Sequence, residues 1–141
     1  DGRGMDKLEA ALKACLMEGP QYFPEDMVTD QPERVICGEI IREKALMLLK
    51  EEVPHGIGVG VDKMVLRDDG MYDVWATIYC EREGHKGIII GRQGSMLKRI
   101  GSEARRDMEW LLGTRVNLQL WVKVKNDWRN STSVMKELGY E

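Results

Sequence analysis

The sequence predicts an α+β domain in which a three-stranded sheet packs against helices. Aliphatic residues occupy every second position over 116–124, and apolar residues recur at helical spacing over 95–112. A hairpin signal, Asp68-Asp69-Gly70, separates two further alternating segments. A sheet with one apolar face buries that face against helices, so these segments belong to one layered domain.

The first part of the chain contains two helices. Apolar residues at helical spacing predict a helix over 5–18, which Gly19-Pro20 ends. A linker without periodicity follows at 20–31. Asp30 can cap a second helix, which extends to about Glu52, ahead of Pro54.

The second part contains all three strands. A strand begins at Ile57, and Tyr72–Cys80 alternates as its hairpin partner. A short helix at 86–90 is expected to enter a turn at Gly91–Gly94. A longer helix then runs from 95 to 112, followed by the strand at 116–124 and a last helix at about 131–138. From Asp30 the expected order is helix, strand, strand, helix, helix, strand, with an appended helix.

Charge is distributed unevenly along the 141 residues, whose formal net charge is −3. Residues 1–33 hold 3 basic and 8 acidic side chains, whereas the remainder holds 18 basic and 16 acidic ones. Six Lys or Arg residues and one acid, Glu103, lie within 84–106. A local basic surface determines affinity for a polyanion, so this region is the candidate anion-binding part of the chain.

The segment Gly91-Arg92-Gln93-Gly94 is the strongest functional signal in the sequence. Glycines let the backbone approach a flat or charged partner, because no Cβ stands in the way. The arrangement resembles the Gly-x-x-Gly turn with which KH domains clamp single-stranded nucleic acid. The alternative is a plain turn between two helices, in which Gly91 only ends the first helix.

A binding site at this turn is expected to combine phosphate contacts with an apolar groove for bases. Backbone amides and basic side chains would hold phosphates, which fixes register without reading sequence. The groove would take apolar side chains from the turn and from a neighbouring strand. The predicted RNA-binding residues are Ile90, Gly91, Arg92, Gln93, Gly94, Leu97, Lys98, Lys86, Val59 and Val61.

Aromatic and basic residues are interleaved near the end of the last strand. Trp121, Lys123 and Lys125 alternate there, and Trp128 follows. Such residues can form a base-stacking surface. Packing against an appended helix or another domain is the more common role, and it is the interpretation we prefer for Trp121.

Several function classes find no support in the sequence. No apolar stretch approaches the ~20 residues that a membrane-spanning helix needs. The chain contains no Gly-x-x-x-x-Gly-Lys-Ser/Thr phosphate loop and no Ser/His/Asp or Cys/His grouping that indicates catalysis. We therefore expect this chain not to be an enzyme and to need no cofactor or metal.

Segments along almost the whole chain resemble the Era family of GTPases. The matching segments are 22–26, 29–34, 39–44, 52–54, 90–94, 100–108, 118–125 and 138–140. The combination is far more specific than Gly-x-x-Gly alone.

The resemblance implies a type II KH domain over 32–141, preceded by a linker at 20–31. Residues 1–19 would be the last helix of a GTPase domain, and GTP and Mg²⁺ would belong only to the rest of that domain. The implied partner is single-stranded RNA, the 3′ end of 16S ribosomal RNA in the small ribosomal subunit, with no binding to DNA. The implied location is the cytoplasm, with peripheral membrane association of the parent protein.

The alternative functional hypothesis is a protein-interaction module. In that case the KH fold would dock another ribosome-assembly factor instead of RNA. A chain that shows no RNA binding at low salt but co-purifies with a protein would favour this alternative.

Overall fold

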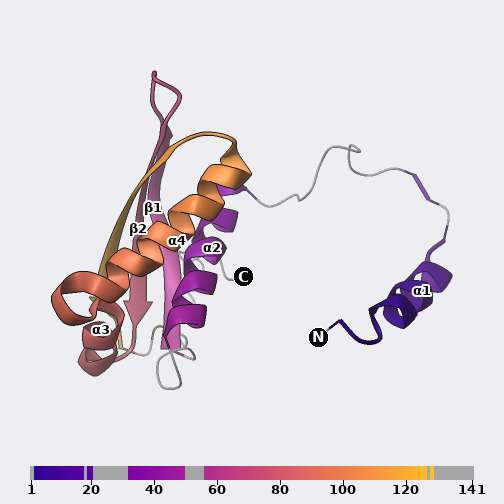
Figure 1. The fold of residues 1–141 in the computed structure, drawn as a ribbon, viewed down its shortest axis with the longest axis horizontal. Coiled ribbons are helices and arrows are strands. Elements are labelled where there is room, and N and C mark those ends of the chain that lie inside the picture. Colours follow the sequence, from indigo (N-terminus) through magenta and orange to yellow (C-terminus); the bar gives the residue numbers. More distant parts are fainter. Residues whose placement is uncertain (1, 18, 21–31, 50–55, 127, 129–141) are drawn as a thin grey trace. The chain divides into compact units, whose positions relative to one another are not determined.

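A computed structural model describes residues 2–17, 19–20, 32–49, 56–126 and 128 (Figure 1). The chain divides into two compact units, Asp1–Asp30 and Gln31–Glu141. The first unit contains helix α1, Met5–Cys15, so the predicted first helix forms but ends three residues early. The predicted cap Asp30 and the predicted last helix at 131–138 lie outside the described residues.

The second unit has the predicted order of elements. It comprises α2 (Glu33–Leu48), β1 (Ile57–Leu66), β2 (Tyr72–Cys80), α3 (Glu83–Ile90), the short 3₁₀ turn η2 (Arg92–Gly94), α4 (Ser95–Leu112) and β3 (Val116–Val124). Helix α2 ends four residues before the predicted Glu52, and α3 begins three residues before the predicted Lys86. The α+β class and the order α-β-β-α-α-β are confirmed.

The three strands form one mixed sheet in the order β1-β2-β3. Strand β2 lies in the centre, antiparallel to β1 and parallel to β3. The β1–β2 hairpin closes where Asp68-Asp69-Gly70 predicts it, with the Gly70 N–H donating to the Arg67 carbonyl at 2.9 Å. The parallel connection from β2 to β3 passes through α3 and α4, which places the turn between these two helices beside the sheet.

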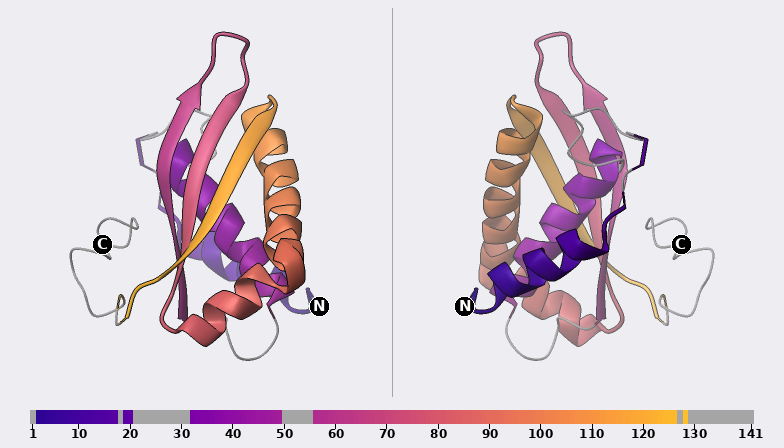
Figure 2. Two further views of the ribbon diagram at one scale, coloured as in Figure 1. Left: turned by 90° about the vertical axis from the view of Figure 1, so that its left-hand side faces the viewer. Right: turned by 90° about the vertical axis from the view of Figure 1, so that its right-hand side faces the viewer.

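One face of the sheet forms the hydrophobic core against α2 and α4. Helix α2 packs on β1, α4 packs on β3, and the two helices contact each other. The side chains at the centre of this core are completely buried; they include Ile41, Val74, Ile78, Ile100 and Met108. Among the described helices of the second unit, none covers the opposite face of the sheet, as the left view of Figure 2 shows.

Strand β1 contains a bulge that changes the alternation of its side chains. The register with β2 shifts between Val61 and Lys63, so that Val61 pairs with Ala76 and Lys63 with Trp75. Asp62 is the extra residue. Because a bulge places two residues opposite one, Asp62 and Lys63 both lie on the face opposite the core, and Met64 returns to the core face.

Candidate nucleic-acid interface

The turn between α3 and α4 requires glycine at its first position. Gly91 has φ 72° and ψ 175°, a combination that residues with side chains essentially never adopt. Its N–H donates to the Gly87 carbonyl at 2.9 Å and ends α3. A Cβ at Gly91 would lie 2.7 Å from the Cβ and 2.9 Å from the backbone nitrogen of Met96. The start of α4 therefore packs directly against this glycine.

The second half of the turn also has left-handed backbone and is open to solvent. Gln93 has φ 53° and Gly94 has φ 77°. A Cβ at Gly94 would meet no heavy atom within 4 Å. Gly94 is the N-cap of α4, where no side chain caps the helix and the first turn holds no acidic residue. The N-terminal amides of α4 and its dipole consequently favour an anion at this turn.

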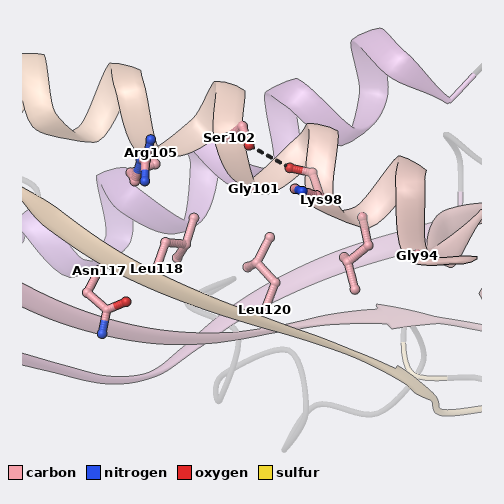
Figure 3. Close-up of a pocket in the computed structure, with 9 residues that line it drawn as sticks. Gly94, Lys98, Gly101, Ser102, Arg105, Asn117, Leu118 and Leu120 are labelled. Atoms are coloured by element: carbon pink, nitrogen blue, oxygen red, sulfur yellow. Dashed lines mark hydrogen bonds between the residues drawn. The ribbon is translucent and has the colours of Figure 1, made fainter.

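A groove of about 370 Å³ extends from the turn between α4 and β3 (Figure 3). Its lining residues are Gly94, Leu97, Lys98, Gly101, Ser102, Arg105, Asn117, Leu118 and Leu120. Leu118 and Leu120 project from β3 toward α4, whereas Asn117 projects from the other side of the strand. Leu97, Leu118 and Leu120 are half-buried and also pack on the core. The groove thus has an apolar floor and a polar rim.

A glycine inside α4 determines how closely the helix approaches the strand. A Cβ at Gly101 would lie 3.3 Å from Cδ1 of Leu120, which is tighter than an ordinary contact. Glycine in a helix interior costs roughly 0.5–1 kcal/mol relative to alanine. Its presence here keeps the space above Leu120 open.

Two cationic residues of the predicted site lie at the groove and at the turn beside it. Arg92 and Lys98 are exposed, and neither forms an ion pair with a described residue. Arg105, farther along the groove, lies 3.9 Å from a Glu109 carboxylate oxygen. Exposed pairs at this distance contribute little, so Arg105 remains available to an anionic ligand.

The structure brings most of the predicted site residues together. Gly94, Leu97 and Lys98 line the groove, and Gly91, Arg92 and Gln93 form the turn at its end. Ile90 is half-buried at the end of α3, and Lys86 lies one turn earlier, 3.9 Å from Glu83. Neither Ile90 nor Lys86 is among the groove's lining residues.

The expected position of Val59 and Val61 in the groove is corrected by the strand order. Both side chains lie in the core, 4% and 6% exposed, on β1. Strand β2 separates β1 from β3, and the strand beside the turn is β3. Leu118 and Leu120 therefore form the strand wall that we expected from Val59 and Val61.

Sequence reasoning did not place Gly101, Ser102, Asn117, Leu118 and Leu120 in the groove. One available signal was the glycine in the interior of a helix, which often marks close approach of another segment. Another was the three- and four-residue spacing from Gly94 through Leu97 and Lys98 to Gly101, which places these residues on one helix face.

The tryptophans differ in their environments. Trp128 is 5% exposed, and its indole N–H donates to the Gly56 carbonyl at 3.2 Å. Trp121, for which we preferred packing, is 44% exposed, and Trp110 on α4 is 86% exposed. Only Trp128 among these three is buried.

Two other kinds of site find no support in the described part of the chain. None of its helices is long and apolar enough to cross a membrane. No group of three or more His, Cys, Asp or Glu side chains within that part could hold a metal ion.

The fold and the turn correspond to a known class of domain. The family model described as KH domain matches residues 52–129, more than half of the chain. The chain therefore belongs to the KH domain family.

Within that family the chain is similar to the GTPase Era. It is 58% identical over 139 residues to GTPase Era of Ruminiclostridium cellulolyticum, covering 96% of this chain and 47% of that protein. It is 55% identical over 138 residues to GTPase Era of Clostridium tetani, covering 98% of this chain and 47% of that protein. The chain spans about half the length of the curated relatives it matches.

Solved structures of Era have the same fold. A crystal structure of Era in complex with MgGDPNP and nucleotides 1506–1542 of 16S ribosomal RNA matches with a TM-score of 0.89 and 43% identity, covering 97% of this chain and 46% of that chain. An Aquifex aeolicus Era variant bound to GDP and AlF4⁻ matches with a TM-score of 0.88 and 43% identity, with the same coverage. The predicted resemblance to the carboxy-terminal KH region of Era is confirmed.

Proposed function

We propose that this chain binds single-stranded RNA in the groove between α4 and β3, with the Gly91–Gly94 turn holding the phosphates. One observation carries the proposal: the open, uncapped N-terminus of α4 adjoins an apolar groove lined by Leu97, Leu118 and Leu120. The first feature suits a phosphate and the second suits unstacked bases.

The charges around the groove support this division of roles. Arg92 and Lys98 lie at the turn end of the groove and have no ion-pair partner among the described residues. A strand of RNA that follows the groove would meet Arg105 next. Phosphate contacts from these cations would set the position of the strand, while the leucines and the groove's polar rim contact bases.

The particular RNA we propose is the 3′ end of 16S ribosomal RNA, bound during assembly of the small ribosomal subunit. The support is the Era relative solved with a segment of that RNA. On this proposal, residues 1–19 form the last helix of a GTPase domain and residues 20–31 the linker. Guanine-nucleotide chemistry then belongs to the part of Era that this chain does not match. The parent protein would act in the cytoplasm and associate peripherally with the membrane.

The most direct test compares two variants at Gly94 that have nearly the same shape. Asn and Asp both tolerate left-handed backbone, and a side chain at Gly94 enters open space. Gly94→Asp adds a negative charge at the phosphate position, whereas Gly94→Asn does not. We expect the Asp variant to bind a short single-stranded RNA at least about ten-fold more weakly than the Asn variant. Equal affinities, with both variants folded, would contradict the role of the turn.

The salt dependence of binding provides a second readout of the same site. For single strands, log K falls with log salt with a slope of about −0.7 for each neutralised phosphate. Lys98→Ala is expected to make the slope shallower by about one such contact. A single-stranded DNA of the same sequence should bind more weakly, because it lacks the 2′-hydroxyl.

The alternative of a protein-interaction module has one observation in its favour. Trp110 is 86% exposed on α4 and its neighbour Leu111 is 38% exposed, outside the groove. Exposed tryptophans are enriched at protein interfaces. RNA binding that survives in Trp110→Ala, together with loss of a co-purifying protein, would show that this surface serves a separate partner.

A further inference from the structure

The face of the sheet that no described helix of the second unit covers carries an aromatic and basic hollow, on the far side of β3 from the groove. The hollow measures about 530 Å³ and is lined by Asp62, Lys63, Trp75, Thr77, Trp121 and Lys123. These residues come from all three strands. We propose that the hollow is a second subsite for the same RNA strand, in which a base stacks on Trp121. The inference rests on the proposed RNA-binding function.

The two tryptophans lie next to each other across the β2–β3 pair. Trp75 pairs with Gln119, and Thr77 pairs with Trp121, so the two indoles are diagonal neighbours on one face. The ammonium of Lys63 lies 5.1 Å from the centroid of the Trp75 ring and occupies a cation–π position. Trp121 is 44% exposed, which leaves its ring accessible to a ligand.

The polar groups around the tryptophans can contact both the phosphates and the unpaired base edges of an RNA strand. Lys63 and Lys123 supply two positive charges at the hollow, and neither forms an ion pair with a described residue. Asp62 accepts a hydrogen bond from the Thr77 hydroxyl at 2.8 Å, which holds its carboxylate in place. Lysines can contact phosphates, and a fixed carboxylate can accept from a base amino group.

The bulge in β1 contributes to the hollow. In a regular strand Asp62 and Lys63 would point to opposite faces, and Lys63 would enter the core. The register shift between Val61 and Lys63 lets both side chains line the hollow. Bulges commonly redirect a side chain next to a functional site.

The hollow and the groove lie on the two faces of the same edge strand. Leu118 and Leu120 face the groove, whereas Trp121 and Lys123 face the hollow. Asn117 lines the groove although it projects from the other side of β3, as Figure 3 shows, and so connects the two surfaces. An RNA that leaves the groove crosses only β3 to reach Trp121.

RNAs of two lengths distinguish binding in the groove from binding at the second subsite. A KH turn clamps about four nucleotides. An RNA of about that length is expected to fill the groove only, and one of about twice that length to reach the hollow as well. Stacking on an aromatic side chain is worth about 1–3 kcal/mol per base, so Trp121→Ala should weaken binding of the longer RNA by about five-fold to 150-fold. Binding of the shorter RNA should remain unchanged.

Two matched variants make the measurement specific to stacking. Trp121→Phe keeps an aromatic face and is expected to retain most of the affinity for the longer RNA. Trp110→Ala removes a tryptophan that is 86% exposed on α4 and should change neither affinity. Thermal unfolding of each variant checks that the fold is intact.

Three results would overturn the second subsite. Trp121→Ala could lower the affinity for both RNAs equally, or for neither, or the wild-type chain could bind both lengths with equal affinity. In each of these cases the Gly94 variants still test the groove independently. A wild-type chain that binds neither RNA would contradict the proposed function and, with it, this inference.

Discussion

At the scale of single residues, the two glycines of the turn have different physical requirements. Gly91 has a backbone conformation restricted to glycine and packs against Met96. Gly94 has a left-handed conformation but faces open space. The first glycine is therefore required to build the turn, and the second leaves its outer surface free for a ligand.

This difference predicts the order of stability losses for two alanine variants. Gly94→Ala should cost about 1–2 kcal/mol, the usual penalty of left-handed backbone for a residue with a side chain. Gly91→Ala should cost more, because its Cβ would also overlap with Met96. Urea unfolding of both variants measures the order. A Gly91→Ala variant as stable as Gly94→Ala would contradict the described turn.

The buried thiols give a second prediction at this scale. Burial, with a smaller contribution from Glu33, raises the pKa of Cys37 from 9.0 to about 11, and burial also raises the pKa of Cys80. The unfolded chain loses these protons at lower pH than the folded chain does, so stability is retained below about pH 9 and falls as pH rises toward 11. Urea unfolding at pH 7, 9 and 10.5 measures this trend.

A thiol reagent provides an independent check on the same residues. In the native chain at neutral pH, Cys15 is exposed and should react rapidly, whereas Cys37 and Cys80 should react only on unfolding. Fast labelling of all three cysteines in the native state would show that the core around Cys37 is not closed as described.

At the scale of elements, the proposed function depends on the contact between α4 and β3. The amphipathic pattern of 95–112 and the alternation of 116–124 predict both elements, and the structure confirms them to within a residue. The sequence also identifies the turn that joins α3 to α4. Which strand lies beside α4 does not follow from periodicity, because alternation indicates only the face on which each residue lies.

That limit explains the error over Val59 and Val61. Strand β1 begins with an alternating segment, as β3 does, and no local pattern indicates that β2 takes the central position between them. The bulge at Asp62 cannot be predicted from the sequence pattern either, since it depends on the pairing of β1 with β2. The groove's leucines and the hollow on the opposite face both follow from the strand order, so neither could be assembled from the sequence.

Gly101 provides a test at the scale of this helix–strand contact. Gly101→Ala adds helix propensity of about 0.5–1 kcal/mol, and Leu120 is a flexible side chain that can shift away from the new methyl group. We expect stability to change by no more than about 1 kcal/mol. RNA affinity should fall by about 1 kcal/mol or more, since the displaced Leu120 fills the groove.

The control for this variant is Gly87→Ala, which also adds a methyl group to a helix. Nothing lies within 4 Å of the position its Cβ would occupy, and Gly87 does not line the groove. It should leave RNA affinity unchanged. If Gly101→Ala binds RNA as tightly as Gly87→Ala does, bases do not occupy the space above Leu120.

At the scale of the whole molecule, the chain has a net charge of −3, yet several of its cationic side chains cluster in one region. The acidic excess lies in residues 1–33, while Arg92, Lys98 and Arg105 gather around one groove. The edge strand β3 then separates that groove from the aromatic hollow. This arrangement matches the path that we propose for one RNA strand, past the turn, along α4 and over the sheet edge.

The central claim is that RNA occupies the groove between α4 and β3. A titration of the ¹⁵N-labelled chain with a short single-stranded RNA, followed by NMR, locates the contact directly. We predict that the largest amide shifts fall on residues 91–102 and 117–120, with small shifts in α2 and at Ile57–Val61. Shifts concentrated on α2 or β1, or no shifts at an RNA concentration that saturates binding in solution, would contradict the claim.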